Sequence, residues 1–357
     1  MWEIQPRYFN PFIALLYLMG TPLKVAVIGT GALGKHHARL YADLAIKQKV
    51  HFVGVYDLEP SRAKSIAQDY GVSAFKNIDD LTDKCDAVSV VTPTNTHAEI
   101  ATQCLKAGCD VLVEKPIAPS LQEAKIMVDV AHKNDKLLQV GHVERFNPVF
   151  DYLDKFVKNP KFIEAHRLSS FPSRSVDIGV VLDLMIHDLD IILALVKSPI
   201  TSVDSAGVHV LSQREDIANT RIKFKNGCIA NLTASRVSPE QMRKIRIFSG
   251  EPNQSYISLD YKKQNGEIYR LAREDEKESN LFEKLMYGKS RKIVSQFGGK
   301  KIVHEPVPIA IEEPLALELK SFIECVKTRD KPLVTGESAT ATLDLALEIS
   351  KQIEDLS

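Results

Sequence analysis

The chain has 357 residues, and its 46 lysines and arginines balance its 46 aspartates and glutamates. This length exceeds what one hydrophobic core usually organises, so we expect two domains. The balanced charge gives no general attraction to nucleic acid or to a membrane surface, and we expect neither as a partner. Five cysteines without a Cys-x-x-Cys pair favour a reducing, cytoplasmic location and predict no metal site.

Residues 1–22 are predicted to form an extension that precedes the first domain. The apolar run at 11–19 is shorter than the roughly 20 helical residues that span a bilayer. It also lacks the basic start and the small-residue cleavage pattern of a signal peptide. Three interpretations of residues 1–18 remain open: a disordered extension, a misassigned start, or an arm that docks on a partner subunit.

Residues 23–147 alternate short β-branched runs with helical stretches, which predicts βαβ units and a doubly wound parallel sheet, a Rossmann domain. Thr96 with Glu99, and Ser120 with Glu123, have capping-box spacing at the starts of two helices. The predicted elements are, in order, strand 25–28, helix 33–45, strand 52–56, helix 61–70, strand 87–91, helix 96–107, strand 111–113, helix 120–132 and strand 137–140.

Residues 148–357 change character, because longer segments alternate with period two, and we expect an α+β domain with an open, mainly antiparallel sheet. Asn226-Gly227 and Asn265-Gly266 each have the composition of a hairpin turn. Residues 272–300 are charged and weakly patterned, and we interpret them as a surface excursion. Strands are expected at 162–170 and 220–225, and helices at 180–196, 315–327 and 338–354. Packing of the last two helices on the first domain is one possible arrangement.

The first predicted strand runs directly into a glycine-rich loop that opens a helix. In this context G-x-G-x-x-G predicts a dinucleotide site, because the first glycine permits the tight turn and the second lets the backbone approach a pyrophosphate. The third glycine permits close packing of helix on strand, and the phosphates would meet the free N–H groups of the helix start. The predicted cofactor-binding residues of the loop are Gly29, Thr30, Gly31, Ala32, Leu33 and Gly34.

Asp57 ends the second strand, at the distance of about 20 residues from the glycines where an acid binds the adenosine ribose. Its carboxylate would accept hydrogen bonds from the ribose hydroxyls and would repel a 2′-phosphate. The sequence therefore favours NAD over NADP. The alternative is that Asp57 only caps the turn into Glu59-Pro60.

Two later strand ends add to this site, because ligands of doubly wound sheets bind outside the carboxyl ends of the strands. Thr92, Pro93, Thr94 and Asn95 follow the strand at 87–91 and are predicted to contact the cofactor. The next strand is followed by a second group with the same predicted role, which consists of Glu114 and Lys115 before Pro116. Lys115 would lie at the nicotinamide end of the crevice.

Together with the glycine loop, Glu114-Lys115-Pro116 resembles the Gfo/Idh/MocA family of glucose-fructose oxidoreductase and inositol dehydrogenase relatives. The resemblance runs from about residue 24 to the end of the chain and implies a Rossmann domain followed by a substrate-binding and oligomerisation domain with an open sheet. It also implies a cis Lys115-Pro116 bond. The further matching segments are Gly141-His142-Val143-Glu144-Arg145-Phe146-Asn147-Pro148, Asp183-Leu184-Met185-Ile186-His187-Asp188, Glu313-Pro314-Leu315 and Pro332-Leu333-Val334-Thr335-Gly336.

Lys115, Asp183 and His187 are the predicted catalytic residues. Oxidation of a secondary alcohol needs a base within reach of the hydroxyl, and the pKa of a histidine suits that task. Asp183 is one helical turn before His187, and Lys115 would stabilise the developing alkoxide. Whether Lys115 or His187 takes the proton stays open, and so does a purely structural His187 in a helix core. Asp188 and Asp190 are second candidates for local contacts.

The substrate is expected to be a sugar or sugar nucleotide. By resemblance the pattern is most similar to the sugar-nucleotide branch, particularly UDP-N-acetylglucosamine 3-dehydrogenases, which implies oxidation at C3 of the hexose. A diphosphate needs cations or backbone donors. The predicted substrate-binding residues are Lys115, Arg145, Asn147, Arg167, Arg174, Asp183 and His187, although Arg145 is equally compatible with an interdomain salt bridge.

Three other functions compete with this prediction. A free-sugar or inositol dehydrogenase would use the same Lys115, Asp183 and His187. A non-catalytic NAD-binding regulator would need neither Lys115 nor His187, and a purely structural protein would leave the glycine loop and Asp57 unexplained. By resemblance we also expect a homo-oligomer, a dimer or tetramer, formed through the open sheet.

Overall fold

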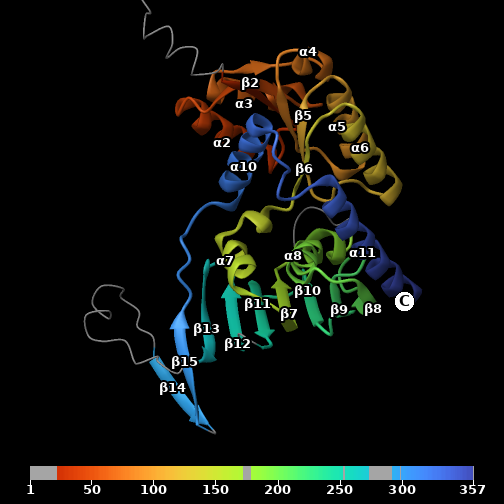
Figure 1. Ribbon diagram of the computed structural model, residues 1–357. Helices are drawn as coiled ribbons and strands as arrows, with labels where there is room; N and C mark the ends of the chain where they lie inside the picture. Colours follow the sequence, from red (N-terminus) through yellow and green to blue (C-terminus); the bar gives the residue numbers. More distant parts are fainter. Residues whose placement is uncertain (1–21, 172–177, 252–253, 273–291, 298, 357) are drawn as a thin grey trace, which may run out of the picture.

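The computed structural model describes residues 22–171, 178–251, 254–272, 292–297 and 299–356, and it contains two sheets with helices packed on them (Figure 1). The expected extension at 1–22 therefore lies almost entirely outside the described residues, and so does Arg174. None of the helices within those ranges is long and apolar enough to cross a membrane.

The first sheet has six parallel strands in the order β3-β2-β1-β4-β5-β6. Chain connections leave β1 in one direction through β2 and β3, and in the other direction through β4 to β6, so the order reverses between β1 and β4. A ligand crevice forms at such a switch point. The elements are β1 (Leu23–Ile28), α2 (Gly34–Ile46), β2 (Val50–Tyr56), α3 (Pro60–Tyr70), β3 (Ser73–Ala74), α4 (Ile78–Thr82), β4 (Ala87–Val90), η1 (Thr94–Thr96), α5 (His97–Lys106), β5 (Asp110–Glu114), α6 (Leu121–Lys133) and β6 (Leu138–Gly141).

The central strands of this sheet are buried on both faces, which explains their continuous apolar runs. Ser120 caps α6, since its Oγ accepts from the Glu123 N–H at 3.2 Å. The capping box predicted at Thr96 and Glu99 is wrong. Thr96 is the last residue of η1 and already has helical backbone angles, and its hydroxyl donates instead to Thr92 Oγ1 and to the Pro93 carbonyl.

The second sheet has nine strands in the order β14-β15-β13-β12-β11-β7-β10-β9-β8, and every neighbouring pair is antiparallel except β7 with β10. The predicted fold class is thus confirmed. The elements are η2 (Val143–Phe146), α7 (Pro148–Phe156), β7 (Pro160–Leu168), η3 (Val181–Met185), α8 (Ile186–Val196), β8 (Ile200–Val208), β9 (Ile217–Phe224), β10 (Ile229–Ser235), β11 (Met242–Ser249), β12 (Ser255–Asp260), β13 (Asn265–Leu271), β14 (Lys292–Phe297), β15 (Lys300–Pro306), α10 (Pro314–Thr328) and α11 (Gly336–Asp355).

Of the two Asn-Gly pairs predicted to form hairpin turns, one forms a turn and the other begins a strand. Gly227 has a φ of +82° between β9 and β10, as a hairpin turn at Asn226-Gly227 requires. Asn265-Gly266 instead begins β13, because Asn265 already pairs with Asp260 of β12. A side chain at Gly266 would overlap the β12 backbone, so this glycine is needed for the close approach of two strands and not for a turn.

The predicted surface excursion at 272–300 is wrong for its last part, because 292–297 forms β14 and pairs with β15. Residues 273–291 lie outside the described residues.

Helices α7, α8 and α11 cover one face of the nine-stranded sheet, and α10 lies beside α2 on the first sheet (Figure 1). Leu319 and Phe322 of α10 are buried in the same cluster as Val25 of β1 and Tyr41 of α2. Helix α11 contributes to both cores, with its first turns packed among the residues of β6 and α6 and its later turns among those of α8. The end of the chain therefore ties the two sheets together.

Candidate functional site

The glycine loop has the geometry that a phosphate-binding turn requires. Gly29 has a φ of +91°, and its N–H donates to the Tyr56 carbonyl at 2.8 Å, which joins the loop to β2. A side chain at Gly29 would overlap the Val91 carbonyl, and one at Gly34 would overlap the Gly29 carbonyl. At Gly31, by contrast, an added Cβ meets nothing within 4 Å. The open side of Gly31 is thus the side on which a pyrophosphate has room to approach.

Asp57 is bonded to the glycine loop and also to its own turn. One carboxylate oxygen, Oδ2, accepts from Thr30 N at 2.7 Å and from Thr30 Oγ1 at 2.9 Å. The other, Oδ1, accepts from Glu59 N at 2.9 Å. Burial opposes the charged form, but the hydrogen bonds from Thr30 and Glu59 outweigh it and lower the pKa of Asp57. A carboxylate has about four acceptor sites, so one site is left for a ribose hydroxyl.

The two predicted loops after β4 and β5 are joined by His97, a buried residue that the sequence analysis missed. Its Nε2 lies 2.9 Å from the Thr92 carbonyl and its Nδ1 lies 2.9 Å from the Pro116 carbonyl. Burial lowers the pKa of His97, and a neutral ring has a single N–H, so it donates to one of these two carbonyls at a time. Thr94 is half-buried, whereas Pro93 and Asn95 are exposed along this edge.

Glu114 is turned into the protein, away from the crevice. Its Oε1 lies 3.1 Å from Nε2 of the fully buried His37 on α2, and its carboxylate packs against Gly141, where a Cβ would come within 2.9 Å of it. The structure thus gives the Glu114 side chain a supporting position below Lys115. The predicted contact of Glu114 with the cofactor stays a prediction.

Lys115 extends from the carboxyl end of β5 to the start of the α8 region. The Lys115–Pro116 bond is cis, as the family resemblance implied. The Nζ atom donates to the Asp183 carbonyl at 2.6 Å and lies 3.5 Å from Asp183 Oδ1. Burial lowers the pKa of Lys115, and the charge of Asp183 opposes that shift. Asp183 lies in η3, a π-helical turn that interrupts the predicted helix, as such turns often do at functional sites.

His187 stands one turn beyond Asp183 and is half-buried. Its pKa is well below the usual histidine value, first because of burial and then because of the cations of Lys115, Arg167 and Arg243 and the neighbouring ring of His142. At neutral pH the imidazole is therefore uncharged and has a free lone pair. Such a ring has the protonation state that a general base needs.

Arg167 is bound in a buried ion-pair network and is 3% exposed. Its Nε and Nη2 donate to the two carboxylate oxygens of Asp188 at 2.7 and 3.0 Å, and its Nη1 donates to Glu144 Oε1 at 2.9 Å. Two carboxylates thus neutralise this guanidinium away from solvent. This network gives Asp188 a structural role and argues against the predicted contact of Arg167 with a substrate diphosphate, which stays a prediction.

Asn147 and Arg145 also have partners within the protein. Asn147 is 2% exposed and caps α7, accepting from Val149 N at 3.1 Å and donating to Tyr261 O at 3.1 Å. Arg145 donates to Asp190 Oδ1 and to the Leu333 carbonyl, both at 3.4 Å. The contact with Leu333 joins the crossover segment to the loop before α11. The structure thus gives Asn147 a capping role and favours the interdomain alternative for Arg145, while substrate contact by either residue stays a prediction.

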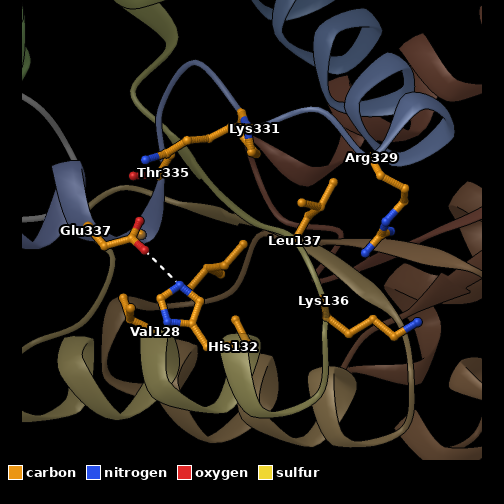
Figure 2. Close-up of a pocket in the computed structure, with 12 residues that line it drawn as sticks. Val128, His132, Lys136, Leu137, Arg329, Lys331, Thr335 and Glu337 are labelled. Carbon is orange, nitrogen blue, oxygen red and sulfur yellow. Dashed lines mark ion pairs between the residues drawn. The ribbon is translucent and has the colours of Figure 1, made fainter.

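A separate pocket of about 330 Å³ lies between α6, the amino end of β6 and the loop before α11 (Figure 2). Basic side chains gather around its mouth, including Lys136, Arg329 and Lys331, and His132 pairs with Glu337 at 2.8 Å. Leu137 and Leu138 are among its apolar lining residues. The pocket contains none of the predicted site residues, because it lies at the opposite strand ends from the glycine loop.

Comparison with known proteins agrees with this geometry. A family model described as "Oxidoreductase family, NAD-binding Rossmann fold" matches residues 23–142, and the GFO/IDH/MocA C-terminal domain matches residues 158–251. The chain belongs to the GFO/IDH/MocA family. The assignment made from Glu114-Lys115-Pro116 and the downstream segments is thereby confirmed.

Several relatives of this family cover most of the chain. The UDP-N-acetylglucosamine 3-dehydrogenase of Acidithiobacillus ferrooxidans is 33% identical over 93% of this chain and 97% of its own length. The scyllo-inositol 2-dehydrogenase (NAD(+)) of Bacillus subtilis is 27% identical over 91% and 92%. A solved structure of the Acidithiobacillus enzyme superposes with a TM-score of 0.80, at 31% identity, over 94% of this chain and 98% of that one.

These matches identify the protein as an oxidoreductase of the GFO/IDH/MocA family that acts on CH–OH groups. The fold places the glycine loop, Asp57 and Lys115 at the carboxyl edge of the first sheet, and Asp183 and His187 reach the same edge from the second domain. His37, His97 and His142 belong to this region too. Local spacing does not reveal these three histidines, because their burial depends on how separate elements of the fold pack together.

Proposed function

We propose that this family member is an NAD-dependent dehydrogenase that oxidises a secondary hydroxyl of a sugar, namely the hydroxyl on C3 of a UDP-N-acetylhexosamine. The observation that carries the proposal is the convergence of Lys115, Asp183 and a neutral His187 at the carboxyl end of β5. Lys115 and Asp183 are held together by the 2.6 Å bond from Nζ to the Asp183 carbonyl. The 33% identity to UDP-N-acetylglucosamine 3-dehydrogenase supports the substrate class.

The cofactor would be held by the glycine loop and Asp57. The open side of Gly31 and the start of α2 fit a pyrophosphate, and the remaining acceptor site of Asp57 fits a ribose hydroxyl. The charge of Asp57 disfavours a 2′-phosphate, which supports NAD over NADP. When bound, the nicotinamide accepts a hydride from the carbon that carries the hydroxyl.

Protein side chains would remove the proton of the substrate hydroxyl. Lys115 would donate a hydrogen bond to the substrate oxygen and stabilise its developing negative charge. His187, uncharged at neutral pH, would accept the proton at the ring nitrogen that faces the cleft. Asp183 would hold the Lys115 ammonium in position through its carbonyl and its carboxylate.

Recognition of a diphosphate needs a cation other than Arg167 and Arg145. Arg243 of β11 is suited to this role, because its side chain is 51% exposed while it lies near His187 and 3.6 Å from Glu144. We propose Arg243 as a contact for the anionic part of the substrate. Arg174 stays a candidate from the sequence, outside the described residues.

A homo-oligomer through the open sheet is part of the proposal. Five aromatic rings form a row across the sheet face opposite the helices, with neighbouring centroids 4.6 to 5.9 Å apart. Phe248 in this row is 40% exposed, which is unusual for a phenylalanine. The row comprises Phe162, Phe248, Tyr256, Tyr269 and His304. A cytoplasmic location is proposed as well, supported by five free cysteines.

The test is an assay of the purified chain with NAD and a panel of substrates. The panel contains UDP-N-acetylglucosamine, its galacto and uronic-acid relatives, myo-inositol, scyllo-inositol and glucose. NADH formed with a UDP-sugar would support the proposal, particularly when an added aminotransferase consumes the keto product and increases the yield.

A second candidate function is an inositol or free-sugar dehydrogenase, favoured by the match to scyllo-inositol 2-dehydrogenase over 91% of the chain. NADH formed only with inositols or glucose would select it. Tight NAD binding without turnover of any panel member would contradict both enzymatic functions and favour a regulator.

A further inference from the structure

Glu215 is a buried carboxylate that the proposed reaction does not use. It lies two residues before β9 and is 2% exposed. Its main-chain carbonyl accepts from the Val180 N–H at 2.9 Å, and its side-chain Oε1 accepts from the Val181 N–H at 3.3 Å. Glu215 therefore binds two successive N–H groups of a segment that lies 34 residues earlier in the chain.

These two N–H groups lie at the start of the helical stretch formed by η3 and α8. Val180 precedes η3 as its N-cap residue and has no side-chain cap, and Val181 is the first residue of the turn. The first N–H groups of a helix have no partner within the helix, and partial positive charge gathers there. The carboxylate of Glu215 thus supplies, from a distant part of the chain, the cap that valine does not provide.

Gly179 leaves the space that this carboxylate occupies. A Cβ on Gly179 would overlap the carboxylate of Glu215, and the three atoms nearest to that position all belong to it. Gly179 is not among the glycines with a positive φ in the described chain, so its backbone conformation suits other residues too. We infer that the carboxylate, and not the backbone, requires a glycine at this position.

Arg236 holds the residue before Gly179. Its guanidinium is fully buried, and Nη1 donates to the Ile178 carbonyl at 2.6 Å. Its Nε donates at 2.8 Å to Oδ1 of Asp216, the residue that follows Glu215. The segment that enters η3 is thus bound at its carbonyl side by Arg236 and at its N–H side by Glu215.

The segment that Glu215 binds leads directly to Asp183. The Asp183 N–H donates to the Gly179 carbonyl at 3.0 Å, and the Asp183 carbonyl accepts from Lys115 Nζ at 2.6 Å. Every link between the Glu215 carboxylate and the Lys115 ammonium is therefore either covalent or a hydrogen bond of at most 3.3 Å.

We propose that Glu215 is a positioning residue of the reaction, which holds the first turn of η3 so that Asp183 meets the Lys115 ammonium. This inference rests on the proposed dehydrogenase function. In this role Glu215 transfers no proton and contacts no substrate. It acts through the carbonyl and the carboxylate of Asp183, which determine where the ammonium meets the substrate oxygen.

The pKa of Lys115 reports on this role. Burial lowers that pKa, and the charge and hydrogen bond of Asp183 raise it. Without its cap the first turn of η3 no longer holds Asp183 beside Lys115, so the pKa of Lys115 falls further. Lys115 must keep its proton to donate to the substrate oxygen, and activity is lost as the pH rises through its pKa. The alkaline limb of kcat/KM should therefore move to lower pH.

Four other titratable or charged groups act together with Lys115. Glu114 raises its pKa and Arg167 lowers it. The rings of His142 and His187 are also close enough for the charge of Lys115 to lower their pKa values. None of the four lies in the first turn of η3, so a shift of the alkaline limb that follows loss of the cap points to Asp183.

The experiment compares E215A, G179A and the double variant G179A/E215A with the unsubstituted chain in the NADH assay, using the substrate identified from the panel. E215A removes the acceptor, whereas G179A displaces the Glu215 carboxylate with a single methyl group. We expect each single variant to lower kcat roughly 10-fold or more and to move the alkaline limb to lower pH, with NAD affinity unchanged. The double variant should be no worse than E215A, because the added methyl group then meets no carboxylate.

Two further variants serve as controls. E215Q keeps an oxygen that accepts from the Val181 N–H, and it should retain most of the turnover. Asp110 is a carboxylate of the same kind, 3% exposed and accepting from the Leu137 N–H at 2.8 Å, but it lies at the other end of β5 from Lys115. D110A should therefore leave kcat and the alkaline limb unchanged. Circular dichroism and NAD titration show whether each variant is folded.

Three results would overturn the positioning role. The first is an unchanged kcat and alkaline limb in E215A and G179A. The second is a lower kcat with the alkaline limb in place, which indicates only a general structural defect. The third is an equal loss from G179A with and without Glu215, because the clash with the carboxylate would then not be its cause.

Hydrogen exchange separates this inference from the proposed function, because it needs no substrate. Exchange at residues 180–183 should be faster in E215A and G179A than in the unsubstituted chain, since both variants free the N–H of Val181. Unchanged exchange would overturn the capping contact itself. Failure of the unsubstituted enzyme with every substrate, despite bound NAD, would instead overturn the proposed function.

Discussion

The Nζ atom of Lys115 donates to the main-chain carbonyl of Asp183 at 2.6 Å and lies 3.5 Å from the carboxylate of the same residue. The two residues come from different domains, so this contact joins the carboxyl end of β5 to the start of the α8 region. One of these two contacts is with the main-chain carbonyl of Asp183. The backbone of the π-helical turn η3 therefore helps the Asp183 side chain to position the Lys115 ammonium group.

Substitution of either proton-handling residue should abolish most of the activity without removing the cofactor. We expect K115M and H187N each to lower kcat about 100-fold or more, since general acid–base groups contribute that much. NAD affinity should change little, as Asp57 and the glycine loop are untouched. Steady-state kinetics with NAD titration checks this, and near-normal turnover in both variants would contradict the mechanism.

The activity should persist at acidic pH. His187 must be uncharged to accept a proton, and burial with neighbouring cations holds its pKa well below the usual 6.5. The acid limb of kcat/KM should therefore lie well below pH 6.5. Removing a neighbouring cation raises the pKa of His187, so R243Q should move the limb toward higher pH. An acid limb at or above the ordinary histidine value would argue against His187 as the base.

Asp57 should determine which dinucleotide binds. D57A removes three hydrogen bonds to Thr30 and Glu59 together with the ribose acceptor, so NAD binding should weaken by roughly 10-fold or more. D57N keeps the shape and loses the charge, and it should narrow the difference between NAD and NADP. Fluorescence titration of both dinucleotides measures this. An unaltered preference in both variants would remove Asp57 from the ribose role.

Much of this site follows from short patterns in the sequence. The glycine loop, Asp57 and Lys115 each stand at the end of a predicted strand, and parallel strands bring such ends to one edge. Asp183 and His187 are one helical turn apart, so a predicted helix already places them on one face. The hydrophobic periodicity does not predict that η3 interrupts this helix.

The features that the sequence did not reveal share a physical cause, which is that burial and long-range pairing are not local properties. The residues next to Arg167 in the sequence do not indicate an ion pair. Its partners Glu144 and Asp188 lie 23 and 21 residues away and enclose it. Asn265-Gly266 has the composition of a turn, yet close strand approach uses the same glycine. Glu114 is directed inward by His37, which is 77 residues away.

The aromatic row should hold subunits together through the open sheet. F248K places a charge within the row of five rings, between Phe162 and Tyr256, and should shift the protein to smaller species. Light scattering after gel filtration measures the mass. I46K is the control, because Ile46 is 81% exposed at the end of α2 in the other domain, and its mass should not change. An unaltered mass in F248K would place any interface elsewhere.

Arg167 should matter for stability rather than for phosphate binding. R167M would leave the buried carboxylate of Asp188 without the cation that pairs with it and would leave Glu144 with Arg243 at 3.6 Å. Loss of one partner from such a network costs about 3–5 kcal/mol of unfolding free energy. R167K keeps one charge but loses the paired bonds to Asp188, so it should fall between R167M and the unsubstituted chain. Urea unfolding gives the free energies. If R167M instead retained its stability and raised only the KM for a UDP-sugar, the guanidinium would have to reach the substrate, and the buried arrangement of this ion-pair network would be wrong.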